Sequence, residues 1–166
     1  MKGSTVADEL ALAADGSPLV LDLDALRQRV GAPLGASAWH TISQDQINAF
    51  ADATGDHQWI HLDPERAAAG PFGTTIAHGY LTLALAPMLL SQVIRVRGAA
   101  MTVNYGLDKV RFPAPVPVDS RVRAVVVLRS FDDVGGGVQG MLGTTFEREG
   151  SDKPVCVAEI LFRYYT

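Results

Sequence analysis

Runs in which apolar and polar residues alternate dominate the C-terminal half of the chain. Alternation with a period of two is typical of strands that bury one face. Turn-forming residues at 132–137 and 150–152 separate the runs, and residues 101–105 precede them as a further strand. Strands joined by short turns predict an antiparallel meander. The apolar positions of the runs are Val122, Ala124, Val126 and Leu128, then Val138, Leu142 and Phe146, then Cys156, Ala158, Ile160, Phe162 and Tyr164.

A long apolar stretch comes before these strands. Residues 77–93 are apolar nearly all round, which predicts a helix buried on every side. Pro87 lies inside this stretch and removes one backbone hydrogen bond, so we expect a bend or an early end there. One such helix followed by a meander predicts an α+β domain in which the sheet curls around the helix.

Polar residues mark the ends of two shorter helices. Ser43, with Gln46 three residues later, resembles a capping box, in which two side chains satisfy backbone N–H groups. Gly55 then ends that helix, and Asp63 caps a second one. The connection between the two helices, residues 56–62, is therefore a loop held at both ends.

Length and composition predict one domain. The chain has 166 residues, of which 48% are hydrophobic and 19% charged, as is usual for a globular domain. Residues 1–30 show no clear period apart from a short helix predicted at 23–30, and we interpret them as an N-terminal extension of unclear role. Residues 31–166 form the single domain.

Charge and cysteine content exclude several classes of protein. A net charge of −4 argues against a general nucleic-acid binder, which normally carries a basic surplus. Cys156 is the only cysteine, so it forms no internal disulfide, and we interpret it as an apolar strand residue. The N-terminus lacks the basic start of a signal peptide, and the apolar stretch at 80–90 is far shorter than the roughly 20 residues that span a bilayer. We therefore expect a cytoplasmic protein with no membrane partner.

Titratable residues concentrate in one stretch, residues 54–80. It holds three of the 4 histidines, His57, His61 and His78, together with Asp56. Asp56 and His61 stand five positions apart, so both side chains could hold one water molecule, with one group withdrawing a proton and the other supplying one. The alternative is a capping aspartate next to a surface histidine.

The start of the long helix adds a second kind of group. The first N–H groups of a helix lack intrahelical partners and concentrate positive partial charge. A substrate carbonyl next to His78 and Gly79 would find donors there for the negative charge of an enolate. Gly79 has no Cβ, so the carbonyl can approach closely. The alternative is that Gly79 only allows tight packing between helix and sheet.

A zinc site is a weaker hypothesis for the same stretch. His57, His61 and Asp63 offer nitrogen and oxygen ligands. The two histidines, however, lie on an expected loop with the bulky Trp59 and not on one face of a helix. We therefore expect no metal.

Further polar and aromatic residues have two interpretations each. Gln58 could orient a water molecule or the aspartate, or bond to the backbone, and Trp59 belongs to the core or to a pocket wall. Lys109 and Arg111 precede the stiff segment FPAPVP at 112–117 and could meet the phosphates of a carrier, or could lie on a solvated strand edge. The expected substrate contacts are His78, Trp59, Lys109 and Arg111.

At these residues the chain resembles the MaoC-like dehydratase family, the (R)-specific enoyl-CoA hydratases, and within it a bacterial subgroup with a GDHQWIH motif. The family motif has glycine, aspartate, any residue, asparagine, proline, an aliphatic residue and histidine, then five residues and a small one. Residues 55–61 read GDHQWIH, with Gln58 and Trp59 in place of asparagine and proline, and Ala67 is the small residue. The resemblance covers the chain from about Ser37 to its end.

The resemblance implies a hot-dog fold, in which a curved antiparallel sheet wraps a long helix, and a pairing of two such units, commonly as a homodimer. It implies Asp56 and His61 as the catalytic pair and the Gly79 N–H as part of an oxyanion site, with Gln58 in an orienting role. The implied reaction, in fatty acid metabolism, is reversible syn hydration of a trans-2-enoyl thioester to the (3R)-hydroxyacyl thioester. The thioester carrier is coenzyme A or acyl carrier protein, so no separate cofactor is implied.

Two other functions have the same fold. A hot-dog acyl-CoA thioesterase would hydrolyse the thioester, and a non-catalytic module would only bind it. The presence of the aspartate and histidine as one unit disfavours the thioesterase. A binding module would need neither Asp56 nor His61.

Overall fold

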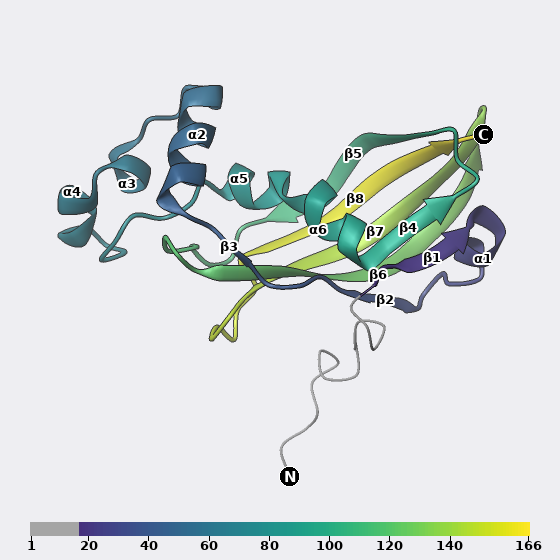
Figure 1. Cartoon of the computed structure of the whole chain (residues 1–166), viewed down its shortest axis with the longest axis horizontal. Helices are drawn as coiled ribbons and strands as arrows, with labels where there is room; N and C mark the ends of the chain where they lie inside the picture. The colour runs from purple at the N-terminus through teal and green to yellow at the C-terminus, as the bar shows by residue number, and fades with distance from the viewer. Residues whose placement is uncertain (1–16) are drawn as a thin grey trace, which may run out of the picture.

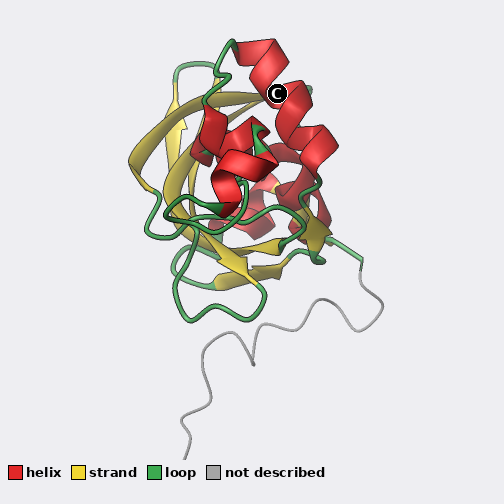
Figure 2. Ribbon diagram, turned by 90° about the vertical axis from the view of Figure 1, so that its left-hand side faces the viewer, coloured by secondary structure: helices red, strands yellow, loops and turns green. Residues whose placement is uncertain are grey.

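The computed structural model describes residues 17–166, and residues 1–16 lie outside the described part (Figure 1). The main layer is a 6-stranded sheet in the order β2-β6-β7-β8-β5, with β3 paired to β6 beside this path. Figure 2 shows the strands curving around the helices. The α+β arrangement expected from the hydrophobic pattern is therefore confirmed.

Four long strands supply most of this sheet. The strands β6, β7 and β8 pair antiparallel in succession, which confirms the meander. Val122, Ala124 and Val126, at alternate positions of β6, are each 0% exposed and point to the core. The fourth strand, β5, pairs with β8 and lies at the edge. The bounds are β5 (Met101–Arg111), β6 (Arg121–Val134), β7 (Gly137–Arg148) and β8 (Cys156–Tyr165), with the shorter β2 (Pro33–Ala36) and β3 (His40–Thr41).

The edge strand is longer than the sequence predicted. We expected a strand at residues 101–105, and Lys109 and Arg111 either in a stiff segment between strands or on a solvated strand edge. Pairing with β8 instead continues to Arg111, opposite Val157, across two irregularities in the register. Lys109 and Arg111 are therefore exposed strand residues at the edge of the sheet, which confirms the second interpretation.

The long apolar stretch forms two helices, α5 (Gly79–Ala84) and α6 (Ala86–Val93), with Leu85 between them. The interruption expected near Pro87 is confirmed, since the proline lies in the first turn of α6, where its missing N–H costs no helical bond. The expectation of burial on every side was wrong. The sheet covers one side of the helices, and Tyr80 (71%) and Met88 (38%) are exposed on the other.

Three short helices lie at one end of the molecule, beyond the start of α5 (Figure 1). The capping box is confirmed, because Ser43 and Gln46 satisfy each other's backbone N–H groups. Gly55 ends α2 in the left-handed region at φ 78, and the side chain of Asp63 caps the start of α4. The connection between them is not wholly a loop, because residues 59–62 form one helical turn, too short to show a period in the sequence. The bounds are α2 (Gln44–Thr54), α3 (Trp59–Leu62) and α4 (Pro64–Ala68).

The described part of the N-terminal extension packs against the domain. The strand β1 (Leu19–Asp22) pairs in parallel with β4 (Ile94–Arg97), and Leu26 of α1 (Leu23–Arg27) is 0% exposed in the core. The helix predicted at 23–30 is thus observed and shorter. Within residues 17–166, no helix is both long and apolar enough to cross a membrane.

Candidate active site

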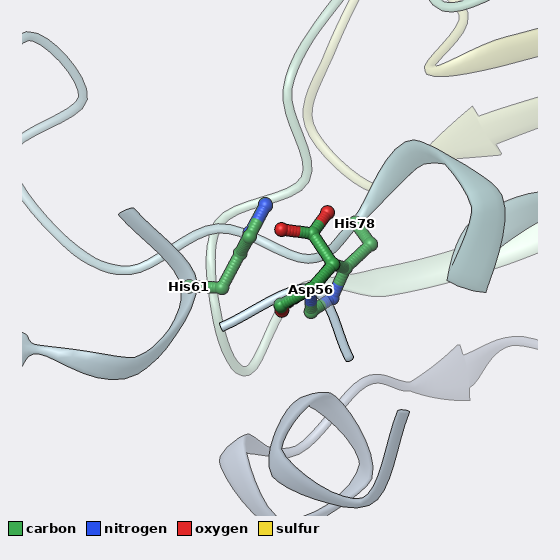
Figure 3. Close-up of side chains that lie close together, drawn as sticks. All are labelled: Asp56, His61 and His78. Carbon is green, nitrogen blue, oxygen red and sulfur yellow. The ribbon is translucent and has the colours of Figure 1, made fainter. Parts of the chain in front are cut away.

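Asp56, His61 and His78 come together at the end of the molecule where α2 and α5 meet. Asp56 follows the glycine that ends α2, His61 lies in α3, and His78 is the residue before α5. One nitrogen or oxygen atom from each side chain lies within 4.8 Å of the others. Figure 3 shows the Asp56 carboxylate and the His61 ring pointing the same way. At this separation, a water molecule can contact the aspartate and the histidine at once.

Three hydrogen bonds fasten the segment that contains Asp56 and His61 to residues 76–78, which lead into α5. The Nδ1 of His61 lies 2.7 Å from the carbonyl of Ile76, and the Ile76 N–H donates to the carbonyl of Ile60 at 3.0 Å. The Nε2 of His78 lies 2.9 Å from the carbonyl of Asp56. Residues 56–61 and residues 76–78 therefore each donate hydrogen bonds to the other segment and accept hydrogen bonds from it.

The bond to Ile76 determines which nitrogen of His61 is free. A carbonyl oxygen can only accept, so Nδ1 carries the proton, and in the neutral ring Nε2 keeps its lone pair. Burial lowers the pKa of His61 from the ordinary value of 6.5, and neighbouring His78 acts in the same sense. The bond to Ile76 and the charge of Asp56 act in the opposite sense and raise this pKa. A neutral imidazole with a free Nε2 can accept a proton from water at neutral pH.

A cavity of about 290 Å³ adjoins His61 and the start of α5. His61 and Gly79 both line it, whereas Asp56 and His78 do not. The other lining residues are mostly apolar and include Phe72, Phe112 and Val155. An apolar cavity with few polar groups suits the acyl part of a ligand. A larger cavity of about 460 Å³ lies between α5, α6 and β5, away from Asp56 and His61.

The alternative zinc ligands do not meet. His57 is exposed and lies 2.9 Å from Asp52, whose carboxylate raises the pKa of the histidine. Asp63 accepts a hydrogen bond from the backbone N–H of Arg66 as the cap of α4. Neither residue therefore joins His61.

The cluster of Asp56, His61 and His78 is poorly shaped for chelation. The rings of the two histidines stack, with their centroids 3.7 Å apart and their planes at 24°. A metal ion must lie near the plane of each imidazole that binds it, along the nitrogen lone pair. Two stacked, nearly parallel rings do not direct their lone pairs to one ion.

Two residues of the motif lie away from the cavity. Gln58 is exposed and precedes α3 without capping it through its side chain. The ring of Trp59 packs 4.4 Å below the guanidinium of Arg66 and against Gly70, where a Cβ would lie 3.0 Å from the ring. Trp59 thus braces α3 against α4 and is not among the residues that line the cavity.

The two basic residues of β5 also lie outside the cavity lining. Lys109 pairs with Glu159 at 3.1 Å, and its side chain is 79% exposed. Arg111 is exposed and precedes Phe112, which lies in the lining. A contact between these residues and a carrier would therefore lie at the edge of the cavity.

Supporting residues of the site were missed in the sequence. The Nε2 of Gln44 donates to the carbonyl of His61 at 2.8 Å, and Thr75 donates to Oε1 of Gln44 at 2.7 Å. Phe112 lies over Gly79, with ring carbons 3.1 Å from where a Cβ would be. These contacts join positions far apart in the chain, so no local pattern indicates them.

The family model described as MaoC like domain matches residues 26–147. The chain belongs to the MaoC-like family. It is 61% identical over 140 residues to 3-hydroxyacyl-thioester dehydratase Z of Mycobacterium tuberculosis, which covers 84% of this chain and 93% of that protein. It is also 50% identical over 129 residues to nodulation protein N of Rhizobium leguminosarum bv. viciae, with 76% and 78% of the two chains covered.

The fold is shared with solved structures. The (R)-hydratase from A. caviae involved in PHA biosynthesis superposes with a TM-score of 0.65 and 25% identity, covering 76% of this chain and 91% of that one. The hot-dog fold implied by the sequence resemblance is therefore confirmed.

Proposed function

We propose that this MaoC-like protein is an (R)-specific enoyl-thioester hydratase, a carbon–oxygen lyase of fatty acid metabolism. It adds water reversibly to a trans-2-enoyl thioester and forms the (3R)-hydroxyacyl thioester. The observation that carries this proposal is the meeting of Asp56 and His61 beside an apolar cavity that also reaches Gly79. The relative at 61% identity has a name that describes the removal of water from a 3-hydroxyacyl thioester, the same reaction in reverse.

The chemistry follows from the positions of the two side chains. Asp56 and His61 hold one water molecule between them in this proposal. The free Nε2 of neutral His61 withdraws a proton from the water while the water oxygen bonds to Cβ. A proton is then delivered to Cα, so that the elements of one water molecule have been added. Because the polar atoms of Asp56 and His61 lie within 4.8 Å of each other, the hydroxyl and the proton come from one side, and the two additions occur on the same face of the double bond.

The negative charge of the intermediate needs its own partner. As the oxygen bonds to Cβ, the electrons of the double bond move toward the thioester oxygen, which becomes enolate-like. The backbone N–H of Gly79, at the first residue of α5, is the proposed donor to this oxygen. The addition of water causes no net change of oxidation state, so we propose that no redox cofactor takes part. The stacked rings of His61 and His78 do not direct their lone pairs to one ion, so we propose that no metal takes part either.

An assay with crotonyl-CoA tests the function directly. Loss of the enoyl absorbance without release of free thiol is expected, and chiral analysis of the product should give the (3R)-hydroxyacyl form. Thiol release would instead indicate the thioesterase, and no change on crotonyl-CoA and on longer enoyl-CoA substrates would indicate a binding module. Asp56→Asn controls for background hydration.

The exposed side of α5, α6 and β5 supports a homodimer. Tyr80, Met88, Tyr105 and Leu107 are exposed there at 71%, 38%, 53% and 46%. An apolar patch next to an edge strand is the kind of surface that proteins cover by association. We propose that a second copy of the chain covers this face.

The carrier of the thioester, coenzyme A or acyl carrier protein, is proposed to contact Lys109 and Arg111. The cytoplasmic location stays a prediction.

A further inference from the structure

His78 is buried beside the catalytic pair and does not line the cavity. It is 3% exposed, and the lining of the cavity next to it includes Ala77 and Gly79 but not His78. Its ring stacks on His61 at 3.7 Å and meets Phe50 at 5.0 Å with a tilt of 51°. A side chain so enclosed acts on the residues around it and not on a substrate.

The chemistry of this ring explains why the position holds a histidine. Its Nε2 faces a carbonyl, which can only accept, so Nε2 carries a proton and donates to Asp56. Its Nδ1 is buried and has no hydrogen-bond partner among the described residues. Burying an unpaired polar atom is unfavourable, and phenylalanine would fill the same space without that cost. The bond to Asp56 is therefore the feature that favours histidine here.

Asp56 needs such a bond because little else fixes it. It is exposed and follows Gly55, whose left-handed backbone ends α2. Among the described residues, the hydrogen bond from His78 ties Asp56 to a segment 22 positions away in the sequence. The same ring sets the face against which His61 stacks.

We propose that His78 is a positioning residue for the hydration reaction, which fixes the main chain of Asp56 through Nε2–H and the plane of His61 through its ring. The inference rests on the proposed function of Asp56 and His61. Asp56 and His61 thus face one water molecule because the buried His78 holds both of them.

Two substitutions separate the donor from the ring. His78→Phe keeps an aromatic ring and removes the donor, whereas His78→Gln keeps an N–H donor at about the position of Nε2 and removes the ring. We expect His78→Phe to lower kcat by about 10- to 100-fold, since small displacements of catalytic groups have effects of that order. His78→Gln should retain more of kcat. KM should change little in both, because the cavity walls stay intact.

The pH profile gives a readout that a merely structural role would not move. The groups that face His61 are the Asp56 carboxylate, the His78 ring and the Ile76 carbonyl. Removal of the ring in His78→Gln admits water to His61, so the pKa of His61 should rise toward its ordinary value. The acid limb of kcat/KM should then move to higher pH, because His61 must be unprotonated to act as a base.

A remote core substitution is the matched control. Val126→Ala removes part of a side chain that is 0% exposed in β6. It should lower the melting temperature and leave both kcat and the acid limb at their wild-type values. A similar pattern in the His78 variants, lower stability with unchanged kcat and acid limb, would overturn the proposal.

The outcomes distinguish this inference from the proposed function. If the wild-type protein hydrates crotonyl-CoA and Asp56→Asn does not, the proposed function stands, and the His78 variants then decide the positioning role. If His78→Phe does not fold, kcat and the acid limb of His78→Gln decide it. If neither variant folds, ¹⁵N NMR of the wild-type imidazoles decides it: a proton on Nε2 of His78 supports the bond to Asp56, and a proton on Nδ1 alone overturns it.

Discussion

The ring of Phe112 lies over Gly79, with three ring carbons 3.1 to 3.2 Å from where a Cβ of residue 79 would be. This contact joins the end of β5 to the start of α5, at the wall of the candidate active-site cavity. Gly79 is therefore needed for close packing, whatever else its backbone does. The role of the Gly79 N–H as a donor can be tested separately from the effect of adding a Cβ at this position.

A pair of substitutions at Gly79 makes this separation. Gly79→Pro removes the N–H at the first position of α5, where proline is tolerated, and His78 before it is already extended at ψ 138. We expect kcat to fall by about 10²- to 10³-fold, as for loss of one oxyanion donor. Gly79→Ala keeps the N–H and adds only the Cβ, so its kcat should fall by less than about 10-fold. Equal kcat values for the two folded variants would show that this N–H is not the donor.

The proposed catalytic roles of Asp56 and His61 can be tested in a protein that keeps its fold. Asp56 is exposed, so Asp56→Asn should leave the melting temperature unchanged and lower kcat by about 10²- to 10⁴-fold. His61→Ala should lower kcat by a similar factor and also reduce stability, because the buried Ile76 carbonyl loses its donor. His57→Gln is the matched control, since that histidine faces Asp52 outside the cluster. Wild-type turnover in both active-site variants would refute the assignment.

The pH dependence of activity should follow His61. Because burial lowers the pKa of His61, the residue is mostly neutral, and the enzyme active, at pH 6.5, where an ordinary imidazole would be half protonated. The acid limb of kcat/KM should therefore lie below pH 6.5. An NMR titration of the His61 ring, in wild type and in His57→Gln to simplify the spectrum, should give the same pKa as the limb.

The same shift has a consequence for stability. In the unfolded chain His61 binds its proton near pH 6.5, whereas in the folded chain it does so only at lower pH. Between these two values the unfolded state binds more protons, so the contribution of His61 to the free energy of unfolding falls as the pH drops below 6.5. Urea unfolding of wild type and His61→Gln at pH 7 and pH 5 should show this difference, and a pH dependence that is the same in both would contradict it.

The proposed dimer face can be disrupted by a single charge. Leu107 is 46% exposed on β5, and Leu107→Asp should convert the dimer to a monomer, because an unpaired carboxylate would be buried in the interface. Val30→Asp is the matched control, since Val30 is 47% exposed outside this face. Analytical ultracentrifugation measures both variants. A wild-type protein that sediments as a monomer at micromolar concentration would exclude the homodimer.

Metal removal should not affect the reaction. The stacked rings of His61 and His78 are unsuited to shared chelation, and hydration of an enoyl thioester needs no redox step. Exhaustive dialysis against EDTA should therefore leave kcat at its original value. Loss of activity that returns when zinc is added back would contradict the proposal.

The features predictable from the sequence are those that depend on neighbours in the chain. The capping box of Ser43 and Gln46 needs only four consecutive residues, and the alternation in β6 reports which face of one strand is buried. Asp56 and His61 are close in the sequence, so their meeting was predictable too. The helical turn of α3 was not, because four residues are too few to show a helical period.

Features that depend on distant contacts could not be predicted in this way. Whether the exposed side of Tyr80 and Met88 is covered depends on the extent of the sheet and not on the apolar character of the helix itself. The bond from His78 to the Asp56 carbonyl spans 22 positions, and its acceptor is main chain, which any residue type provides. The sequence therefore suggested His78 as a substrate contact, whereas in the structure its buried ring stacks on His61 and is not among the residues that line the cavity.

The position of β5 has one more consequence. The strand ends at Arg111, and the next residue, Phe112, forms part of the cavity wall over Gly79. A partner that pairs with the open edge of β5 would thus restrain the backbone on which Phe112 is mounted. Only one peptide bond therefore separates the proposed dimer contact from the wall of the cavity.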